Sequence, residues 1–265
     1  MKDKSIPAQR RNEILFQLEK DRFIRSSTLS EVLSVSEATL RRDLEILEKQ
    51  GIIERTHGGA MISHRMQNEP AFSASTETFS GEKELIGATA ASLVESRDTI
   101  FINFGTTNTQ VARSLKNRTD LTDVTVITNN ISVVLELQNE SAFNIICLGG
   151  HYRSHSNSLV GALTLKGIDG IYASKAFIGV DGISLKYGCT TPVETDAEIS
   201  QKMIENTNGQ IIVVADNSKW GVVSNYRVVD LERISMLVTD NKLSSDARKT
   251  LDEMPIQVLF GNERS

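Results

Sequence analysis

The sequence predicts an α/β protein with two domains, a small N-terminal one and a larger one built on a mostly parallel sheet. Three observations support this prediction. Amphipathic helical patterns follow closely on one another before residue 50, residues 63–80 are polar with no sustained period, and from residue 82 short apolar segments alternate with amphipathic ones. Such alternation is typical of a parallel sheet covered by helices on both faces. We therefore expect domains at 1–62 and 81–265, joined by a linker at 63–80.

The helix expected after Ser36 is the most informative element of the small domain. Leu40, Leu44 and Leu47 fall on one stripe of a helix with 3.6 residues per turn, and Ser36 is a natural N-cap. Its exposed first turn offers short side chains and guanidinium groups, which suit the major groove of DNA. The candidate DNA-binding residues are Ser36, Ala38, Thr39, Arg41 and Arg42. The alternative is a solvated helix with Arg41–Glu45 and Arg42–Glu45 ion pairs.

The neighbouring segments favour the DNA-binding interpretation. Two further helices are expected upstream, marked by Ile14, Leu15 and Leu18 and by Leu29, Val32 and Leu33. Only Ser34 and Val35 separate the second helix from the cap of the third. Downstream, 52–55 and 60–62 are expected to form a two-stranded wing. Three short helices with a tight turn before the last, followed by a hairpin, form the winged helix-turn-helix arrangement. Arg55 and His57 of the hairpin are candidates to contact the DNA backbone or the minor groove.

The charge is divided unevenly between the two parts. Residues 1–65 contain 12 Lys and Arg against 10 Asp and Glu, a net charge of +2, whereas the rest contains 17 against 24, a net charge of −7. This small N-terminal excess predicts modest nonspecific affinity for DNA. Binding is then expected to depend on individually placed arginines and on two or more DNA-binding domains acting together. The acidic larger domain is not expected to contact DNA.

Composition indicates an ordinary globular protein. We expect a cytoplasmic protein, because the sequence has no run of 18 apolar residues and no apolar signal-peptide core. Cys147 and Cys189 lie far apart without metal or redox spacing, and both are expected to be buried thiols. His151 and His155 are four residues apart in a polar loop without nearby acidic or cysteine ligands, so we expect no metal site there and no cofactor.

Alternating strands and helices are expected throughout the larger domain. The expected strands are 99–103, 124–128, 143–148, 175–180, 210–215 and 235–239. The expected helices are 82–94, 107–117, 130–139, 193–206 and 245–252. Because ligands of parallel sheets bind where the loops collect at the carboxyl ends of the strands, the residues that follow these strands are candidates for a binding site.

Five polar motifs lie just past expected strands. They are Gly105-Thr106-Thr107-Asn108, Thr128-Asn129-Asn130, Leu148-Gly149-Gly150-His151-Tyr152-Arg153, Val180-Asp181-Gly182 and Asp216-Asn217-Ser218-Lys219-Trp220. A glycine turn at a helix N-terminus presents free amides that suit a phosphate group. Each motif alone is also compatible with an ordinary turn. Together they favour a sugar-phosphate pocket.

The sequence VSEATLRRDLEILEKQGIIERTHGGA resembles the N-terminal signature of the DeoR family of bacterial sugar-metabolism regulators. The later motifs GTT, TNN, LGG, G-x-D-G and D-x-S-K occur in the order found in the family's effector-sensing domain. The chain departs from the family pattern at Ser34, where glycine is common, at Asn103-Phe104, where Asp-Ser is common, and at Trp220, where Phe is common. The effector-binding residues that the resemblance implies are Gly105, Thr106, Thr107, Thr128, Asn129, Gly149, Gly150, Arg153, Asp181 and Lys219.

The resemblance implies a DNA-binding repressor of sugar uptake or catabolism genes, controlled by a phosphorylated sugar. Its implied partners are operator DNA and that metabolite, with no membrane, and the protein is expected to be a homodimer or homotetramer. The sensing domain is also similar to ribose-5-phosphate isomerase, so an isomerase is the alternative. Such an enzyme needs a general base, for which Glu194, Asp196 and Glu198 are the candidates. Acidic residues are also favoured at a helix start for structural reasons, and we expect no catalysis.

Overall fold

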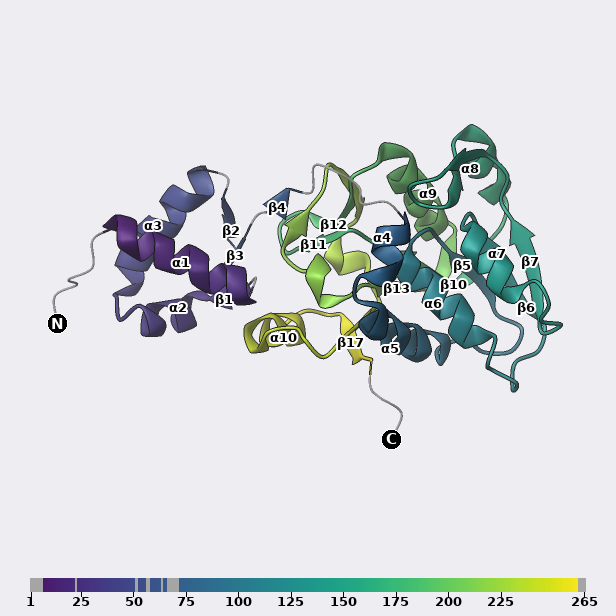
Figure 1. Cartoon of the computed structure of the whole chain (residues 1–265), viewed down its shortest axis with the longest axis horizontal. Coiled ribbons are helices and arrows are strands. Elements are labelled where there is room, and N and C mark those ends of the chain that lie inside the picture. The colour runs from purple at the N-terminus through teal and green to yellow at the C-terminus, as the bar shows by residue number, and fades with distance from the viewer. Residues whose placement is uncertain are drawn as a thin grey trace.

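The computed structural model describes residues 7–21, 23–50, 52–55, 58–62, 64–65 and 72–261. Figure 1 shows a small N-terminal domain beside a larger α/β domain, with the short strand β4 (His64–Arg65) between them. We call residues 7–62 the head and residues 72–261 the body. Within this described part of the chain, no helix has the length and apolar character needed to cross a membrane.

Three helices form the core of the head, because each places its apolar residues on one face. They are α1 (Pro7–Asp21), α2 (Ser26–Val32) and α3 (Glu37–Lys49). The predicted leucine stripe of α3 is buried together with Ile14 and Leu18 of α1. An antiparallel sheet in the order β1-β3-β2 completes the head, formed by β1 (Phe23–Arg25), β2 (Ile53–Arg55) and β3 (Gly59–Ile62). The predicted winged helix-turn-helix fold is confirmed, with β1 as an additional strand.

Polar contacts fix the approach of α3 to the rest of the head. Ser34, in the turn before α3, has a φ of 53°, a conformation that glycine adopts at least cost. Ser36 caps α3 as predicted, because its Oγ accepts a hydrogen bond from the Thr39 amide at 3.2 Å. On the inner face of α3, the carboxylate of Asp43 is 2% exposed and accepts a hydrogen bond from Arg10 Nε at 2.5 Å. A buried charge needs such a partner.

The body is built on a seven-stranded parallel sheet in the order β17-β16-β13-β10-β5-β6-β7. Its strands are β5 (Thr99–Ile102), β6 (Val124–Thr128), β7 (Phe143–Cys147), β10 (Ala173–Gly179), β13 (Thr207–Val214), β16 (Met236–Thr239) and β17 (Gln257–Phe260). The predicted mostly parallel sheet is confirmed, and β17 adds an unpredicted edge strand. At the other edge, Cys147 is exposed, which corrects the expectation of a buried thiol, whereas Cys189 is buried.

Helices cover both faces of this sheet. On one side lie α5 (Ser80–Ala91), α6 (Thr106–Leu115) and α7 (Ile131–Leu137), and on the other α8 (Ala162–Ile168), α9 (Glu194–Glu205) and α10 (Ser245–Asp252). Alternate residues of a strand point to opposite faces. Accordingly, Ile100 and Ile102 belong to the first apolar core and Phe101 to the second.

The segment expected to be a linker contains regular structure. β4 pairs in parallel with β14 (Val222–Val223) of the body. A helix, α4 (Phe72–Glu77), follows within the region that the sequence assigned to the linker. α5 begins directly after Phe79, which has a φ of 55°. The part of this segment nearest the body therefore packs on it, and residues 66–71 lie outside the described chain.

Two small antiparallel units stand at the carboxyl edge of the parallel sheet. One is the hairpin of β8 (His151–Arg153) and β9 (Ser158–Val160). The other is a sheet in the order β11-β12-β15, from β11 (Gly182–Ser184), β12 (Gly188–Thr191) and β15 (Tyr226–Val229). Both units are too short to show a period in the sequence.

Candidate functional site

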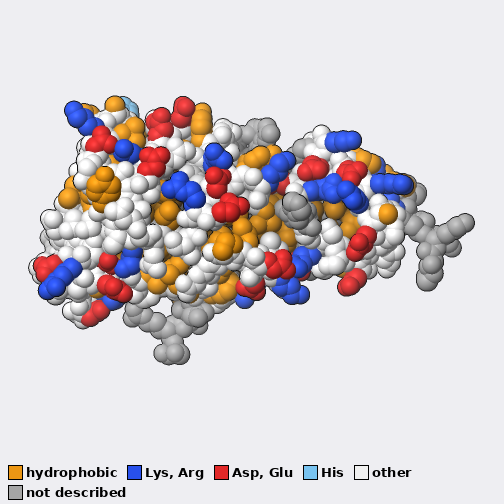
Figure 2. Space-filling view, turned by 180° about the vertical axis from the view of Figure 1, so that it is seen from behind, with side chains coloured by type: hydrophobic (Ala, Val, Ile, Leu, Met, Phe, Trp, Pro, Cys, Tyr) orange, Lys and Arg blue, Asp and Glu red, His pale blue; other side chains and the backbone are white. Residues whose placement is uncertain are grey.

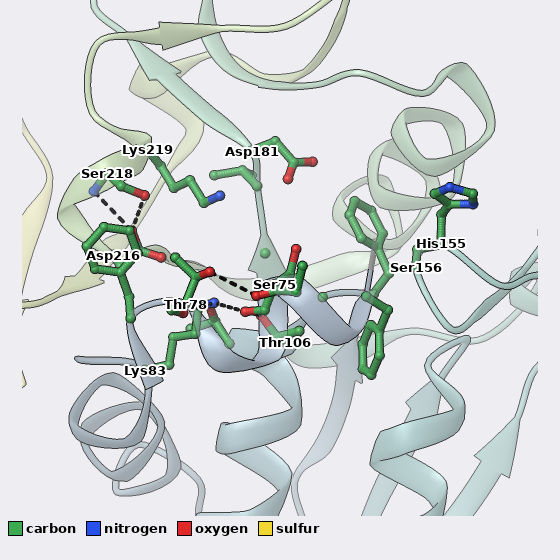
Figure 3. Close-up of a pocket in the computed structure, with 18 residues that line it drawn as sticks. Ser75, Thr78, Lys83, Thr106, His155, Ser156, Asp181, Asp216, Ser218 and Lys219 are labelled. Atoms are coloured by element: carbon green, nitrogen blue, oxygen red, sulfur yellow. Dashed lines mark hydrogen bonds between the residues drawn. The ribbon is translucent and has the colours of Figure 1, made fainter. Parts of the chain in front are cut away.

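A cavity of about 230 Å³ opens at the carboxyl ends of β5, β10 and β13. The turn between β8 and β9 and the segment from α4 to the start of α5 form its other walls (Figure 3). Its polar lining residues are Ser75, Thr78, Lys83, Thr106, Thr107, His155, Ser156, Asp181, Asp216, Ser218 and Lys219. The cavity lies where open parallel sheets bind their ligands.

The N-terminus of α6 points into this cavity. Gly105 is its N-cap, with a φ of 105° that requires glycine, and it provides no side-chain hydrogen bond to the first amides of the helix. Thr106 and Thr107 follow in the first turn and line the cavity. Thr106 Oγ1 donates to the Ser75 carbonyl of α4 at 3.4 Å. The positive end of a helix dipole and uncapped amides are the features of an anion site.

Lys219 faces the same space from the opposite wall. It ends the short helix η1 (Asn217–Lys219), which Asp216 caps by accepting hydrogen bonds from the Ser218 amide at 3.0 Å and from the Ser218 hydroxyl. Figure 3 shows the Lys219 side chain directed into the cavity, with Asp181 and Thr106 on the walls around it. Among the described residues, no side chain forms an ion pair or hydrogen bond with the Lys219 ammonium. Its charge is available to a ligand.

Two carboxylates line the cavity together with Lys219. Asp181 Oδ2 accepts a hydrogen bond from Thr191 Oγ1 at 2.8 Å, which fixes the side chain in the cavity wall. Asp216 is 2% exposed, and its Oδ2 has no hydrogen-bond partner among the described residues. A buried acceptor without a partner is costly. The cavity therefore offers acceptors for hydroxyl groups as well as donors for an anion.

Lys83 is a cavity residue that the sequence analysis missed. It is 5% exposed, and its ammonium donates to the carbonyl oxygens of Ser75 at 2.5 Å and Thr78 at 2.8 Å. Burial lowers its pKa, and the nearby Lys219 lowers it further, whereas Asp216 and Asp181 raise it. A lysine in the first turns of a polar helix ordinarily indicates a solvated surface. Lys83 instead attaches α4 to α5 and so holds one wall of the cavity in place.

Other predicted ligand residues lie outside the cavity lining. Thr128 ends β6 and Asn129 follows it, but their side chains donate to the carbonyls of Ile102 at 2.7 Å and Leu159 at 3.0 Å. The neighbouring Asn130 donates to the Gly105 carbonyl at 3.2 Å. This loop therefore supports the glycine turn from behind.

The Gly149-Gly150 turn also has a packing role. A Cβ on Gly150 would lie 2.1 Å from Thr164 Oγ1, so only glycine fits. Neither glycine lines the cavity, and Arg153 points elsewhere: its guanidinium is 3.6 Å from Asp196 Oδ2. Instead, the turn of the same hairpin brings His155 and Ser156 to the cavity.

The candidate catalytic bases are not in the cavity wall. Asp196 is fully buried, with its Oδ2 3.6 Å from the Arg153 guanidinium. Glu194 and Glu198 belong to the same helix, α9, and do not line the cavity. The arrangement lacks a carboxylate from this group in reach of a ligand there. Among the described residues, no group of three or more His, Cys, Asp or Glu side chains could hold a metal ion.

The candidate DNA-binding residues of α3 lie on its outer face. Ser36, Ala38, Arg41 and Arg42 are exposed and Thr39 is half-buried. Arg41 is 73% exposed and 3.3 Å from Glu45, an exposed pair that contributes little to stability. Arg42 makes no ion pair with any residue that the structure describes. Figure 2 shows basic side chains gathered along the upper part of the head.

Arg55 and His57 belong to the predicted wing. Arg55 is 24% exposed and lies 3.4 Å from Glu45 and 3.8 Å from Glu48 of α3. It therefore connects the wing to α3 through acidic residues. His57 lies outside the described residues.

Comparison with known proteins identifies both parts of the chain. The family model of the DeoR-like helix-turn-helix domain matches residues 10–66, and that of the DeoR C terminal sensor domain matches residues 78–241. The HTH-type transcriptional repressor GlcR of Bacillus subtilis is 34% identical over 93% of both chains. The putative aga operon transcriptional repressor of Escherichia coli O157:H7 is 30% identical over 97% of this chain and 94% of its own.

Solved structures are more distant. Ribose 5-phosphate isomerase A from Methanocaldococcus jannaschii is 18% identical and covers 54% of this chain and 55% of its own, with a TM-score of 0.39. The translation initiation factor eIF-2B from Pyrococcus horikoshii is 15% identical, covers 84% and 70% of the two chains, and has the same TM-score, 0.39. The two family models match the head and the body in order, and the curated relatives align along nearly their full length. The chain belongs to the DeoR family of transcriptional regulators.

Proposed function

We propose that the protein represses genes for sugar uptake or breakdown, and that a phosphorylated sugar in the body cavity sets its affinity for operator DNA. The uncommitted ammonium of Lys219, which shares the cavity with the N-terminus of α6, is the observation that carries this proposal. A phosphate group between them would gain a charged partner and several free amides. The names of two relatives, both repressors, support the repressor mode.

The remaining cavity residues suit the sugar portion of such a ligand. Asp181 and Asp216 are carboxylate acceptors, which pair well with hydroxyl groups. We assign direct contacts to Gly105, Thr106, Thr107, Asp181 and Lys219. To Thr128, Asn129, Gly149, Gly150 and Arg153 we assign the support of the surrounding loops, in keeping with their hydrogen bonds and packing.

Operator binding is assigned to the outer face of α3. Its short side chains, Ser36, Ala38 and Thr39, allow close approach to the bases, while Arg41 and Arg42 reach guanine edges or phosphates. Arg55 and His57 are assigned to the DNA backbone. The modest positive charge of the head favours a homodimer or homotetramer, in which two heads read two half-sites.

An isomerase activity has less support. A general base must lie within hydrogen-bonding distance of the proton it abstracts. Of the three candidate carboxylates, Asp196 is buried beside Arg153 and the other two lie outside the cavity lining. None of these three carboxylates is therefore placed to take a proton from a ligand in the cavity.

A mobility-shift experiment tests the proposal. The probe is the DNA upstream of the protein's own gene, and the titrants are aldose and ketose monophosphates of three to six carbons. We expect one or more of them to change operator affinity. Lys219→Met should abolish that response while leaving operator binding intact, because Lys219 lies in the cavity and the DNA-binding face belongs to the head.

Lys116→Met is the matched control, since Lys116 is exposed at the far end of α6. It should behave like the wild type. A protein that ignores the DNA but isomerises a sugar phosphate would contradict the regulatory proposal. Failure of every sugar phosphate to change operator affinity would contradict the assigned ligand class.

A further inference from the structure

The wing and the body meet at a buried hydrogen bond. Glu54 of β2 is 4% exposed, and its Oε2 accepts a hydrogen bond from Ser184 Oγ at 2.5 Å. Its other carboxylate oxygen is buried without a hydrogen-bond partner among the described residues. Burial raises the pKa of Glu54, against the Ser184 hydrogen bond and the charge of Lys186, which lower it. A carboxylate held by a single hydrogen bond is only partly compensated for its burial, so a small change can unseat it.

The strand that carries Ser184 begins at the effector cavity. Asp181 lines the cavity, and β11 (Gly182–Ser184) follows it directly. The three residues of this strand therefore connect a cavity carboxylate at one end with the Glu54 contact at the other. A short extended strand passes a displacement at one end to the other, because its backbone has little freedom to absorb it.

A second segment of the chain connects the cavity with the head, and it begins at Lys219. Lys219 is followed by Trp220 and Gly221, and the Gly221 amide donates to the Ile183 carbonyl of β11 at 2.9 Å. β14 comes next and pairs with β4, on the segment that leads from the head. The two routes are packed together: a Cβ on Gly182 would lie 2.3 Å from the Val222 carbonyl oxygen. With no free space between them, β11 and β14 are expected to shift as one unit.

We propose that the Ser184–Glu54 hydrogen bond is the contact through which the ligand in the cavity controls the position of the head. This inference rests on the proposed function. A ligand that draws Asp181 and Lys219 toward it moves β11 and β14 together. This movement changes the geometry of the hydrogen bond between Ser184 and Glu54. Glu54 lies on β2, the first strand after α3. A change in the position of Glu54 relative to the body therefore reorients the DNA-reading helix. The ligand acts by favouring one of the two arrangements over the other.

The test measures coupling separately from binding in the full-length protein. Operator affinity is determined by fluorescence anisotropy, with and without a saturating concentration of the sugar phosphate that is most effective in the panel above. Affinity for that sugar phosphate is measured by calorimetry. The variants are Glu54→Ala, Glu54→Gln, Ser184→Ala and the double variant Glu54→Ala/Ser184→Ala. Ser174→Ala is the matched control. Ser174 Oγ also donates to a carboxylate, that of Asp98, but at the amino-terminal ends of the parallel strands, away from the cavity. Circular dichroism and thermal melting confirm that each variant is folded.

For the wild type we expect the sugar phosphate to change operator affinity by about 5- to 150-fold, the usual range of allosteric coupling. Glu54→Ala and Ser184→Ala should bring this ratio close to one while sugar-phosphate affinity is retained. The double variant should add nothing, since both changes remove the same interaction. Glu54→Gln should keep the response, because its amide oxygen accepts the same hydrogen bond. Ser174→Ala should match the wild type.

Retention of the full response by Glu54→Ala would overturn the inference. So would loss in Ser184→Ala alone, because Ser184 Oγ also accepts hydrogen bonds from the Lys186 and Tyr187 amides in the β11–β12 turn. Such a loss would then come from the turn. These outcomes can be distinguished from failure of the proposed function. That failure would already appear in the wild type, as the absence of operator binding or of any response to sugar phosphates. It would also overturn the inference, which rests on the proposed function.

Discussion

The head and the body cavity both present basic side chains, but they hold them in opposite ways. On the head, Arg42 is exposed and makes no ion pair with a described residue. In the cavity, Lys83 is buried and both of its hydrogen bonds go to backbone carbonyls. Lys219 lies between these extremes, half-buried in the cavity wall and without an ion-pair or hydrogen-bond partner among the described residues.

This difference distinguishes the side chains that we propose bind ligands from those that stabilise the fold. An exposed arginine has little effect on the stability of the fold. It is therefore free to contact DNA, whose phosphates attract any nearby cation. A buried lysine must first be satisfied within the protein. Lys83 therefore stabilises the wall of the cavity, whereas Arg42 and Lys219 lack an ion pair with any described residue and are two cations to which we assign external ligands.

Leu44→Ala should have the largest effect on the head, because it removes the apolar support of α3. Leu44 is 2% exposed in the head core, and truncation of a buried leucine costs about 2 to 5 kcal/mol. We expect operator binding to be lost and calorimetric binding of sugar phosphate by the body to remain. Ile46→Ala, on the same helix but 40% exposed, is the control and should cost far less. If urea unfolding showed the same loss of unfolding free energy for both variants, the burial of Leu44 in the head core would be contradicted.

Lys83→Met tests the structural role of the buried lysine in the cavity wall. It removes two hydrogen bonds from a charged donor, each worth about 1.5 to 3 kcal/mol, and part of this loss is offset because the buried charge disappears. We expect lower stability in urea and weaker sugar-phosphate binding, with operator affinity unchanged in the absence of the ligand. If the variant bound sugar phosphate as the wild type does, α4 would not be part of the site.

Arg42→Ala tests the exposed cation. It should weaken operator binding by about 1 to 3 kcal/mol if Arg42 contacts a base, or reduce the salt slope of binding by about one if it contacts a phosphate. Sugar-phosphate affinity and thermal stability should not change. Arg233→Ala, an exposed arginine of the body, is the control. Anisotropy titrations at several salt concentrations distinguish the two kinds of contact, and an unchanged affinity would remove Arg42 from the interface.

The smallest effect concerns pH at the boundary of the two regions. Burial raises the pKa of Glu54 above its ordinary value of 4.5, although Ser184 and Lys186 lower it and Glu48 raises it. The folded protein then retains a proton that the unfolded chain releases, so this contribution to stability is complete below pH 4.5 and is lost as the pH rises through the folded pKa. The stability of Glu54→Gln relative to the wild type should therefore increase with pH in this window. Urea unfolding at a series of pH values measures it, and a constant difference would contradict it.

The head is more predictable from the sequence than the cavity, for a physical reason. Leu40, Leu44 and Leu47 form a periodic pattern, and the Ser36 cap depends on residues three positions apart. Lys83 and His155, in contrast, reach the cavity because segments distant in sequence are brought together, and no local pattern records that approach. The motifs that follow strands do lie at the edge of the sheet where the cavity opens. They did not show which side chains turn toward the cavity, as Arg153 illustrates by facing Asp196.

The order in which the chain leaves the ribosome gives the head–body contact a further meaning. The head is complete by residue 62, and domains generally fold as units from the N-terminus during synthesis. Its contacts with the body arrive much later, from Ser184 and from Asp246, whose carboxylate accepts a hydrogen bond from the Arg25 amide at 2.7 Å. The last strand, β17, must also join the sheet edge. A nascent or truncated chain would thus hold a folded DNA reader before the elements that govern it exist.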